Sequence, residues 1–438
     1  MTTIRVNGLS DIITVLPYHL GYRPTDSLVV ACFAAGRLGV VARIDLPPPG
    51  VDPWRCVDPV LEVVLREQPE AAMVIAYEGA AAATALWPPD QRRFVSDPVS
   101  IAMRDGLCAL GVSVIARVIV HDERWWCLDG GDGCCPREGT RLPPADEVSA
   151  VAAYVLLGCD PVADRRALEG TIAPRDLVGL GGLGGVDGVV GVDGVVDHQC
   201  GVVLDRMMRS YQPGAERRRR RFQEHALREW GALLAAPQTD PAWGSGGRQV
   251  RSAPRTVAWA AVSLLDHQLR DLVIATLCPG SVDPLDFPLA LRRAAARHLP
   301  VGLLDRPPHG LHDNGAVVGV GEHGDEGDFE VFADLRDAAG LGDIGESGDS
   351  GVLADFGEVE AFRRRGALVE ALAALCRATP YDLAPGPLTV LASVAWWLGN
   401  GTLARASVDQ ALRIDPDYRL AQLLTDVLDL AVRPARSA

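Results

Sequence analysis

The sequence predicts an α/β protein in which a layered N-terminal domain with a mixed sheet precedes an all-α C-terminal region. Over the first 170 residues, apolar runs of strand length alternate with stretches of helical spacing. Beyond residue 358 the apolar spacing is helical throughout. A chain of 438 residues is also too long for one ordinary hydrophobic core. We therefore expect an α/β domain at 1–170, an insertion and linker region at 171–254, and a helical domain at 255–438.

The N-terminal domain is predicted to begin with a helix and a β-hairpin. Ser10 suits the N-cap of a helix over 10–20, and Pro17 keeps that helix short or kinks it. Gly21 suits the left-handed residue that ends the helix. A turn at 35–37 separates two strand-like apolar runs, as in a hairpin. Strands and helices then alternate, which is typical of a layered domain with a mixed sheet. The expected strands lie at 28–33, 38–46, 71–77, 112–120 and 125–128, and the expected helices at 54–67, 98–110 and 146–158.

The middle of the chain is expected to be less regular. A near-tandem Gly/Val-rich repeat at 179–204 indicates a low-complexity insertion, and polar, Pro/Gly-rich residues at 238–254 indicate a linker. Between them, 216–235 has the pattern of an arginine-rich helix. A further helix is expected at 255–277, before an acidic, Gly-rich loop at about 305–357.

The stretch at about 385–432 is predicted to be a tetratricopeptide-like helical hairpin. Leu388 and Ala395 stand where that roughly 34-residue template has large aromatics, and no second copy lies one repeat upstream. Because a single repeat buries too little surface to fold alone, the hairpin must pack on the helices before it. An ordinary helical bundle is the alternative. The template spacing runs through Leu388, Leu391, Ala392, Ala395, Ala404, Val408, Ala411 and Pro416, and the residue types fit at all of these positions except Leu388 and Ala395.

Charge and basic-residue usage exclude several classes of chemistry. The net charge of −15 disfavours wholesale neutralisation of phosphates, so general nucleic-acid binding is not expected. The chain contains no lysine. A GxxxxGK[ST] phosphate loop, a kinase β3 lysine, a Schiff-base lysine and a Ser-Lys hydrolase are therefore excluded.

The distribution of apolar residues predicts a cytoplasmic protein without a membrane span. No stretch of 18 or more uncharged apolar residues occurs. The N-terminal residues lack a basic segment followed by a long apolar core, so a secretory signal is not expected.

Polar residues around the first predicted hairpin form the candidate ligand site. Arg23, Asp26 and Ser27 precede its first strand, and Arg43 and Asp45 lie on its second strand. Asp and Ser side chains near a strand start can hold a hydroxyl or a metal-bound water, although no positioned base accompanies them. The structural alternative is a turn whose backbone amides are capped by Asp26 or Ser27.

A cysteine cluster forms the candidate metal site. His121, Cys127, Cys134 and Cys135 together supply the four soft or imidazole ligands that zinc requires. A redox-labile cysteine pair is a second interpretation. We favour a third, buried thiols around a tryptophan-anchored hairpin, because adjacent cysteine side chains diverge and no CxxC knuckle is present.

Two charged clusters have a functional and a structural interpretation each. The five consecutive arginines at 217–221 can grip phosphates of a nucleic acid or another anionic partner. On a helix, however, they spread over every face, which favours a solvated helix start. Asp266 and His267 stand one turn before Arg270 and Asp271, as in a polar cluster facing a pocket or a helix-surface ion pair.

The remaining motifs are weak. Two strings match GxGxxG, at 179–184 and 319–324, but neither has the strand and helix that dinucleotide binding requires. His309, His312 and His323 indicate a polar loop more than a weak metal site. No GxSxG, HExxH or paired CxxC motif occurs.

The chain resembles an uncharacterised actinobacterial family of domains of unknown function, numbered 4192. The resemblance covers about residues 9–170 and 255–432, and it implies a soluble, cytoplasmic protein without an established activity. The motifs that carry it are Leu16-Pro17-x2-Leu20-Gly21-Tyr22-x-Pro24-x2-Ser27-Leu28-Val29, Ala42-Arg43-x-Asp45-Leu46-Pro47, Arg124-Trp125-Trp126, Cys134-Cys135-Pro136-x-Glu138-Gly139-Thr140, Arg270-Asp271 and the helical hairpin near 388–416.

We expect a non-enzymatic binding or regulatory protein that contacts a protein partner through its C-terminal helices. The repeat-like hairpin and the lack of a complete catalytic constellation favour this function. The alternative is an enzyme or small-ligand-binding protein with a pocket at the N-terminal sheet.

Overall fold

The chain forms two compact units, each built from two stretches of sequence. Residues 1–165 and 311–358 form one, here called the sheet unit, and residues 166–310 and 359–438 form the other, the helical unit. The computed structural model describes residues 4–6, 8–34, 37–48, 50–79, 96–129, 135–136, 138–156, 160–174, 192–239, 253–299, 316–318 and 356–429.

The apolar runs of the N-terminal region form strands of one mixed sheet, as predicted. The strand order is β1-β8-β3-β2-β4-β5-β6-β7. β2 pairs antiparallel with β3 and β4, whereas β4 and β5 are parallel. The strands are β1 (Ile4–Val6), β2 (Ser27–Ala34), β3 (Arg37–Asp45), β4 (Ala71–Tyr77), β5 (Ser113–His121), β6 (Arg124–Cys127), β7 (Thr140–Arg141) and β8 (Ala316–Val318).

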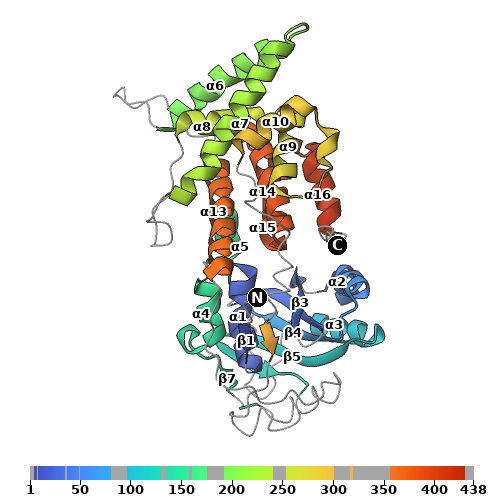
Figure 1. Ribbon diagram of the computed structural model, residues 1–438. Coiled ribbons are helices and arrows are strands. Elements are labelled where there is room, and N and C mark those ends of the chain that lie inside the picture. Colours follow the sequence, from blue (N-terminus) through green and yellow to red (C-terminus); the bar gives the residue numbers. More distant parts are fainter. Residues whose placement is uncertain are drawn as a thin grey trace, which may run out of the picture. The chain divides into compact units, whose positions relative to one another are not determined.

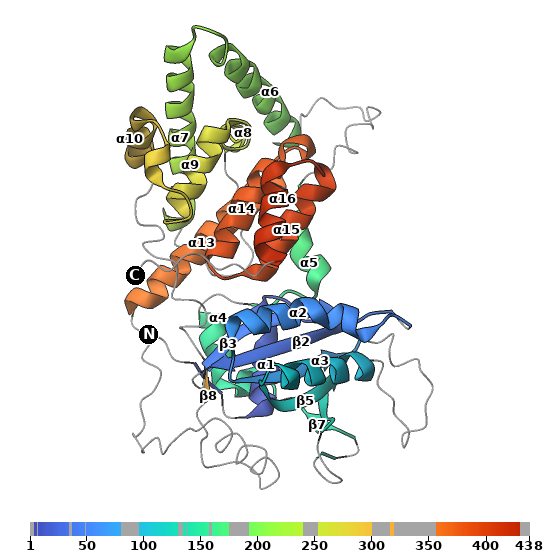
Figure 2. The same ribbon diagram turned by 90° about the vertical axis from the view of Figure 1, so that its right-hand side faces the viewer.

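Helices cover both faces of the sheet, which explains why β2 and β4 are buried along almost their whole length. α2 (Pro53–Glu67) and α3 (Asp97–Ala109) lie on one face, and α1 (Leu9–Leu20) and α4 (Ser149–Leu156) lie on the other (Figures 1 and 2). α1 ends at Gly21, whose φ of 79° is the left-handed conformation expected from the sequence.

The core between the sheet and the α2/α3 layer is aliphatic. Its members come from β2, β4, β5 and the inner faces of the two helices. On β2 and β4 they are every second residue, because alternate residues of a strand face the same side of the sheet. They include Leu28, Val30, Cys32, Val57, Val60, Val64, Val74, Met103, Leu107 and Ile119.

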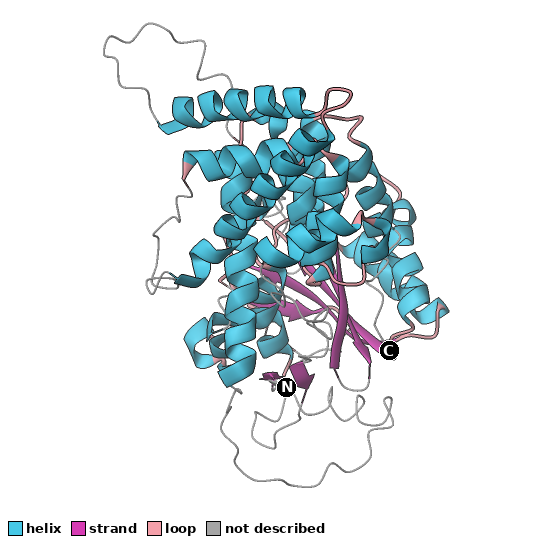
Figure 3. Cartoon of the chain, turned by 45° about the horizontal axis from the view of Figure 1, so that its top comes forward, coloured by secondary structure: helices cyan, strands magenta, loops and turns pink. Residues whose placement is uncertain are grey.

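The second unit consists of helices around a core that contains three tryptophans, Trp230, Trp259 and Trp397. Figure 3 shows the strands gathered in a single sheet, with helix elsewhere. Of the described helices, none is long and apolar enough to cross a membrane. The helices from α5 onward are α5 (Arg165–Gly170), α6 (Val192–Ser210), α7 (Glu216–Thr239), α8 (Pro254–Ser263), α9 (His267–Leu277), α10 (Leu289–His298), α13 (Phe356–Ala378), α14 (Pro385–Trp397), α15 (Gly401–Ile414) and α16 (Arg419–Asp429).

α14 and α15 correspond to the predicted hairpin. Every residue of α14 except Trp396 is buried. Asn400 caps α15, because its Oδ1 accepts the Leu403 N–H at 3.0 Å. Their likeness to a tetratricopeptide repeat stays a prediction.

Three expectations about the middle of the chain differ from the structure. The region 171–254 contains two long helices, α6 and α7, where we expected an insertion followed by a shorter helix. The helix expected over 255–277 is broken at 264–266, because the Asp266 carboxylate caps a new helix by accepting the Gln268 N–H at 3.0 Å. Within the acidic stretch at 305–357, Ala316–Val318 is a strand of the sheet unit. Both GxGxxG strings and the three loop histidines lie outside the described residues.

Candidate functional site

Three of the five predicted ligand-site residues meet where β2 begins and β3 ends, in the interior of the strand order. The Ser27 hydroxyl accepts hydrogen bonds from Arg43 Nε at 2.9 Å and Nη2 at 2.6 Å. It donates its own proton to the Thr25 carbonyl at 2.5 Å. Arg43 also forms an ion pair with Asp45, Nη2 to Oδ1, at 2.5 Å. The Ser27 proton thus goes to a carbonyl and not to a general base, which indicates a structural hydroxyl.

The other two predicted residues, Asp26 and Arg23, do not join this group and contact other parts of the chain. Asp26 has a φ of 44° and accepts the Gly79 N–H through Oδ1 at 3.0 Å. A Cβ at Gly79 would lie 2.9 Å from that carboxylate, so a larger residue there would displace the Asp26 side chain. Arg23 is exposed, and its backbone N–H donates to the Val162 carbonyl at 3.0 Å. The Asp26 carboxylate thus binds an amide beyond β4 and not an amide of its own turn, which differs from the capping role that the turn interpretation gave it.

The structure separates His121 from the two described cysteines of the predicted zinc set, which contact each other. The His121 Nδ1 lies 3.0 Å from the Glu78 carbonyl, and Nε2 lies 3.2 Å from Asp122. The Cys135 Sγ accepts the Cys127 N–H at 3.4 Å. Cys134 lies outside the described residues. Among the residues that are described, no three His, Cys, Asp or Glu side chains gather as a metal site.

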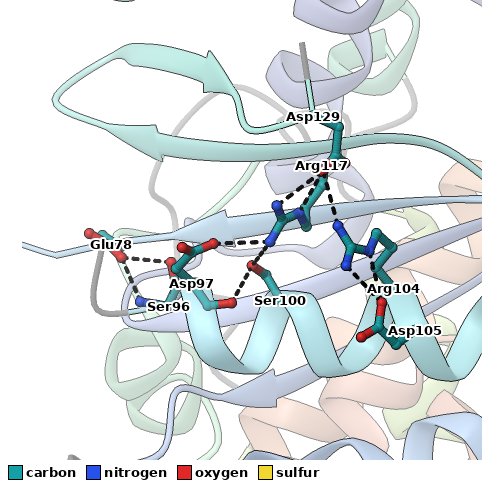
Figure 4. Close-up of polar contacts among 8 residues, drawn as sticks. All are labelled: Glu78, Ser96, Asp97, Ser100, Arg104, Asp105, Arg117 and Asp129. Atoms are coloured by element: carbon teal, nitrogen blue, oxygen red, sulfur yellow. Dashed lines mark hydrogen bonds and ion pairs between the residues drawn. The ribbon is translucent and has the colours of Figure 1, made fainter. Parts of the chain in front are cut away.

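A buried arginine network, which the sequence did not single out, ties α3 to β5 (Figure 4). Arg117 is 6% exposed. Its Nη1 donates to Asp97 at 3.0 Å and to the Ser100 hydroxyl at 3.2 Å, and its Nε donates to Asp129 at 3.1 Å. Two carboxylates and a hydroxyl thus satisfy a guanidinium that would otherwise be costly to bury.

A carboxylate also occupies the N-terminal end of α3. Glu78 Oε1 accepts hydrogen bonds from the Ser96 N–H at 2.8 Å and the Ser96 hydroxyl at 2.6 Å (Figure 4). α3 connects the parallel strands β4 and β5, and in such units the helix N-terminus is where anionic ligands bind. Glu78 fills that position here, which weakens the case for a phosphate ligand at the sheet.

In the helical unit, Asp266 joins α9 to α7 and to the α6–α7 connection. The carboxylate accepts hydrogen bonds from the Tyr211 hydroxyl and from Gln223 Nε2, the latter at 2.9 Å. Burial, followed by the Asp266 carboxylate, raises the pKa of Tyr211. Arg219 lies over the Tyr211 ring, 4.7 Å from its centroid, and its Nη2 is 3.9 Å from Asp266. This network fixes the corner between α6 and α7.

The polar cluster predicted around Asp266 separates into two parts. Asp266 belongs to the network just described, whereas Arg270 pairs with Asp271 at 2.8 Å. Arg270 Nη1 also lies 3.5 Å from the Tyr418 hydroxyl. The latter contacts agree with the ion-pair interpretation.

A solvent-open pocket of about 500 Å³, here called the cavity, lies between α6 and α7, which diverge from the turn that joins them (Figure 2). Most of the side chains that line it are exposed. One face of α6 and one face of α7 line it, together with Gln212 of the connection. Four of the eight lining residues are arginine, and one of these, Arg209, is paired with Asp205, so the lining carries a net positive charge. The lining residues are Val202, Arg206, Arg209, Ser210, Gln212, Arg218, Arg221 and Phe222.

The helix divides the arginine run among three environments. Arg218 and Arg221 line the cavity, Arg219 turns to Asp266, and Arg217 and Arg220 are exposed outside the lining. Consecutive helical residues are about 100° apart, so two of five neighbours reach one face. The expected spread over all faces therefore still places a pair in the cavity.

The two arginines of α6 already have partners within the protein, whereas those of α7 do not. The Arg206 guanidinium lies over the Trp259 ring, 5.3 Å from its centroid. Arg209 pairs with Asp205, and both side chains are more than half exposed. Within the described chain, neither Arg218 nor Arg221 forms an ion pair or a side-chain hydrogen bond. Their charges are therefore available to a ligand.

Comparison with known protein families gives a match over most of the chain. A family model described as "Domain of unknown function (DUF4192)" matches residues 10–306 and 359–435. No curated protein and no solved structure matches the chain.

Proposed function

The chain belongs to the DUF4192 family, a domain of unknown function, and from its helical unit we propose a binding protein whose α6–α7 cavity takes a small anionic ligand. One observation carries this proposal: four arginines from two helix faces line a single cavity in a chain of net charge −15. Guanidinium groups bind phosphate and carboxylate through paired hydrogen bonds. The volume also falls in the range of roughly 300–1,000 Å³ that small-molecule sites occupy.

The lining favours binding over catalysis. It contains no histidine, cysteine or carboxylate that would act as a nucleophile or a general base. Its only hydroxyl, on Ser210, donates to the Arg206 carbonyl at 2.8 Å. A ligand in this cavity therefore meets positive charge and polar groups, and no group positioned to transfer a proton.

Isothermal titration calorimetry of the full chain with inorganic pyrophosphate, tripolyphosphate and citrate tests the proposal. We expect saturable binding of at least one of these anions, weakening as salt increases. The double variant Arg218→Ala/Arg221→Ala should lose it. Arg217→Ala/Arg220→Ala is the matched control, since it removes the same charge from the same helix outside the cavity. Absence of binding by all three anions, or equal loss in both double variants, contradicts the proposal.

A protein contact through the C-terminal helices, favoured by the sequence, stays a second proposal. α14 is buried by its own unit, so a partner would meet α15 and α16, where Leu423 is 46% exposed. Deleting residues 358–438 is no test of this, because α13–α16 belong to the core. In the full chain, Leu423→Asp should reduce the amount of partner protein that the chain captures. Asp426→Asn, on the same helix, should leave that amount unchanged. Equal capture by both variants argues against it. A cytoplasmic location and an actinobacterial source likewise stay predictions.

A further inference from the structure

The four arginines of the cavity form two pairs, one on each helix. Arg206 and Arg209 are three residues apart on α6, and Arg218 and Arg221 are three residues apart on α7. Residues at this spacing are neighbours on a helix surface. Each helix therefore borders the cavity with two adjacent guanidinium groups.

The net charge of the cavity comes from these arginines. Asp205, the nearest carboxylate on α6, pairs with Arg209 at the exposed surface and is not part of the lining. Asp266 engages Arg219 and also lies outside the lining. α6 ends where α7 begins, so the dipoles of the two helices largely cancel at that corner. An occupant consequently faces four guanidinium groups, of which the one on Arg209 is already paired with Asp205.

A single phosphate group matches this arrangement poorly. A phosphate monoester carries roughly −1.5 to −2 charge at neutral pH, which suits one arginine pair and not two. The cavity volume of about 500 Å³ also exceeds what one phosphate fills. Two linked phosphates match both the charge and the division of the arginines between two helices.

We propose that the ligand of this cavity is a small molecule carrying a diphosphate group, with one phosphate held by the α6 pair and the other by the α7 pair. This inference rests on the proposed function, because it assumes that the cavity binds a small anion. Val202 lies on the same face of α6, one turn before Arg206, and is 49% exposed. It supplies an apolar wall against which the organic part of such a ligand packs.

The placement of the remaining arginines favours a small ligand over a nucleic acid. A nucleic-acid backbone would run along an extended basic surface and would engage the exposed Arg217 and Arg220 as well. A diphosphate inside the cavity contacts neither of them. These two residues therefore distinguish the two kinds of ligand.

The experiment compares inorganic orthophosphate, inorganic pyrophosphate and ADP by calorimetry on the full chain. We expect pyrophosphate to bind at least about tenfold more tightly than orthophosphate, because only pyrophosphate reaches both pairs. ADP should bind at least as tightly as pyrophosphate. Arg209→Ala and Arg221→Ala, alone and combined, form a cycle across the two helices. Their effects should be coupled for pyrophosphate and additive for orthophosphate. Thermal unfolding of each variant verifies that it is folded.

The outcomes separate this inference from the proposed function. Equal affinities for orthophosphate and pyrophosphate, or additive effects on pyrophosphate, overturn the diphosphate assignment and leave anion binding intact. Binding of neither anion and of no citrate overturns both. Tight binding of a single-stranded oligonucleotide that Arg217→Ala/Arg220→Ala weakens as much as Arg218→Ala/Arg221→Ala also overturns the diphosphate assignment. A pyrophosphate preference that depends on both helices and survives Arg217→Ala/Arg220→Ala supports it.

Discussion

We predict that the protein loses stability in mild acid because of His19, a residue of α1 whose ring contacts Tyr154 of α4. Its Nδ1 lies 3.1 Å from the Tyr154 hydroxyl, and burial lowers the pKa of His19 from 6.5 to about 4. In the unfolded chain the same imidazole takes up a proton near pH 6.5. Stability contributed by His19 is therefore fully present above pH 6.5, falls as the pH drops toward 4, and changes no further below that.

The magnitude follows from the two pKa values. Each pKa unit corresponds to about 1.4 kcal/mol at room temperature. The difference between 6.5 and about 4 then amounts to about 3 kcal/mol of unfolding free energy. Because domain stabilities are commonly about 5–15 kcal/mol, a loss of this size is measurable.

The assay is urea unfolding of the wild-type chain and of His19→Gln between pH 7.5 and pH 4. Glutamine keeps a hydrogen-bonding group near Tyr154 but does not titrate, so the difference between the two curves isolates the histidine. We expect the wild type to lose about 3 kcal/mol relative to His19→Gln across this interval. His198→Gln, on the exposed surface of α6, should follow the wild type. A constant difference between wild type and His19→Gln would refute the reasoning.

Three further substitutions test the packing described above by chemical denaturation. Arg117→Met should cost about 1.5–3 kcal/mol, since it removes the charged hydrogen bonds to two partly exposed carboxylates. Arg104→Met, at the exposed margin of the same network, should cost under about 1 kcal/mol, and equal losses would contradict this account. Gly231→Ala should destabilise the α7–α10 contact by at least about 1 kcal/mol, because its Cβ would lie 2.0 Å from the His298 carbonyl oxygen; an unchanged unfolding midpoint rejects that. Asn400→Ala should cost about 1 kcal/mol and Asn400→Asp much less, as expected for an N-cap; similar losses would show that the cap is unimportant.

The sheet unit could be predicted well because its signals are local. Alternating apolar runs and the turn at 35–37 are enough to define the β2–β3 hairpin, and Gly21 marks the end of α1 by itself. β8 lies between β1 and β3 and pairs with residues about 300 positions earlier in the sequence, and no local pattern carries that information.

The helical unit could be predicted less completely, because the Gly/Val-rich composition of α6 obscures the helical spacing of its buried residues. Val196, Cys200 and Val203 recur at helical spacing and are buried, but they stand in a Gly/Val-rich stretch that resembles low complexity. Without α6, the arginine run on α7 had no opposing surface, so the cavity could not be foreseen. Asp266 caps α9 through a local contact with Gln268, but its other partners, Tyr211 and Gln223, come from 43 to 55 residues earlier, so the network around it could not be predicted.

The candidate sites show the same limit. Ser27, Arg43 and Asp45 could be grouped correctly because antiparallel pairing brings them together from adjacent strands. Arg117 could not be assigned partners, since Asp97 and Asp129 come from a helix and from the residues after β6. A lone arginine in an apolar strand, VSVIARVIV, was the available sign of a buried network.

The division of the helical unit into two stretches of chain constrains how the protein is made. Trp230 and Leu272 come from 166–310, and they share one core with Leu372 and Leu391 from 359–438. Ribosomes add about 5–20 residues per second. The first stretch therefore emerges several seconds before the helices that complete its core. During that interval its apolar surface is exposed to solvent, so a nascent chain stalled before α13 should be a preferred client of ribosome-associated chaperones.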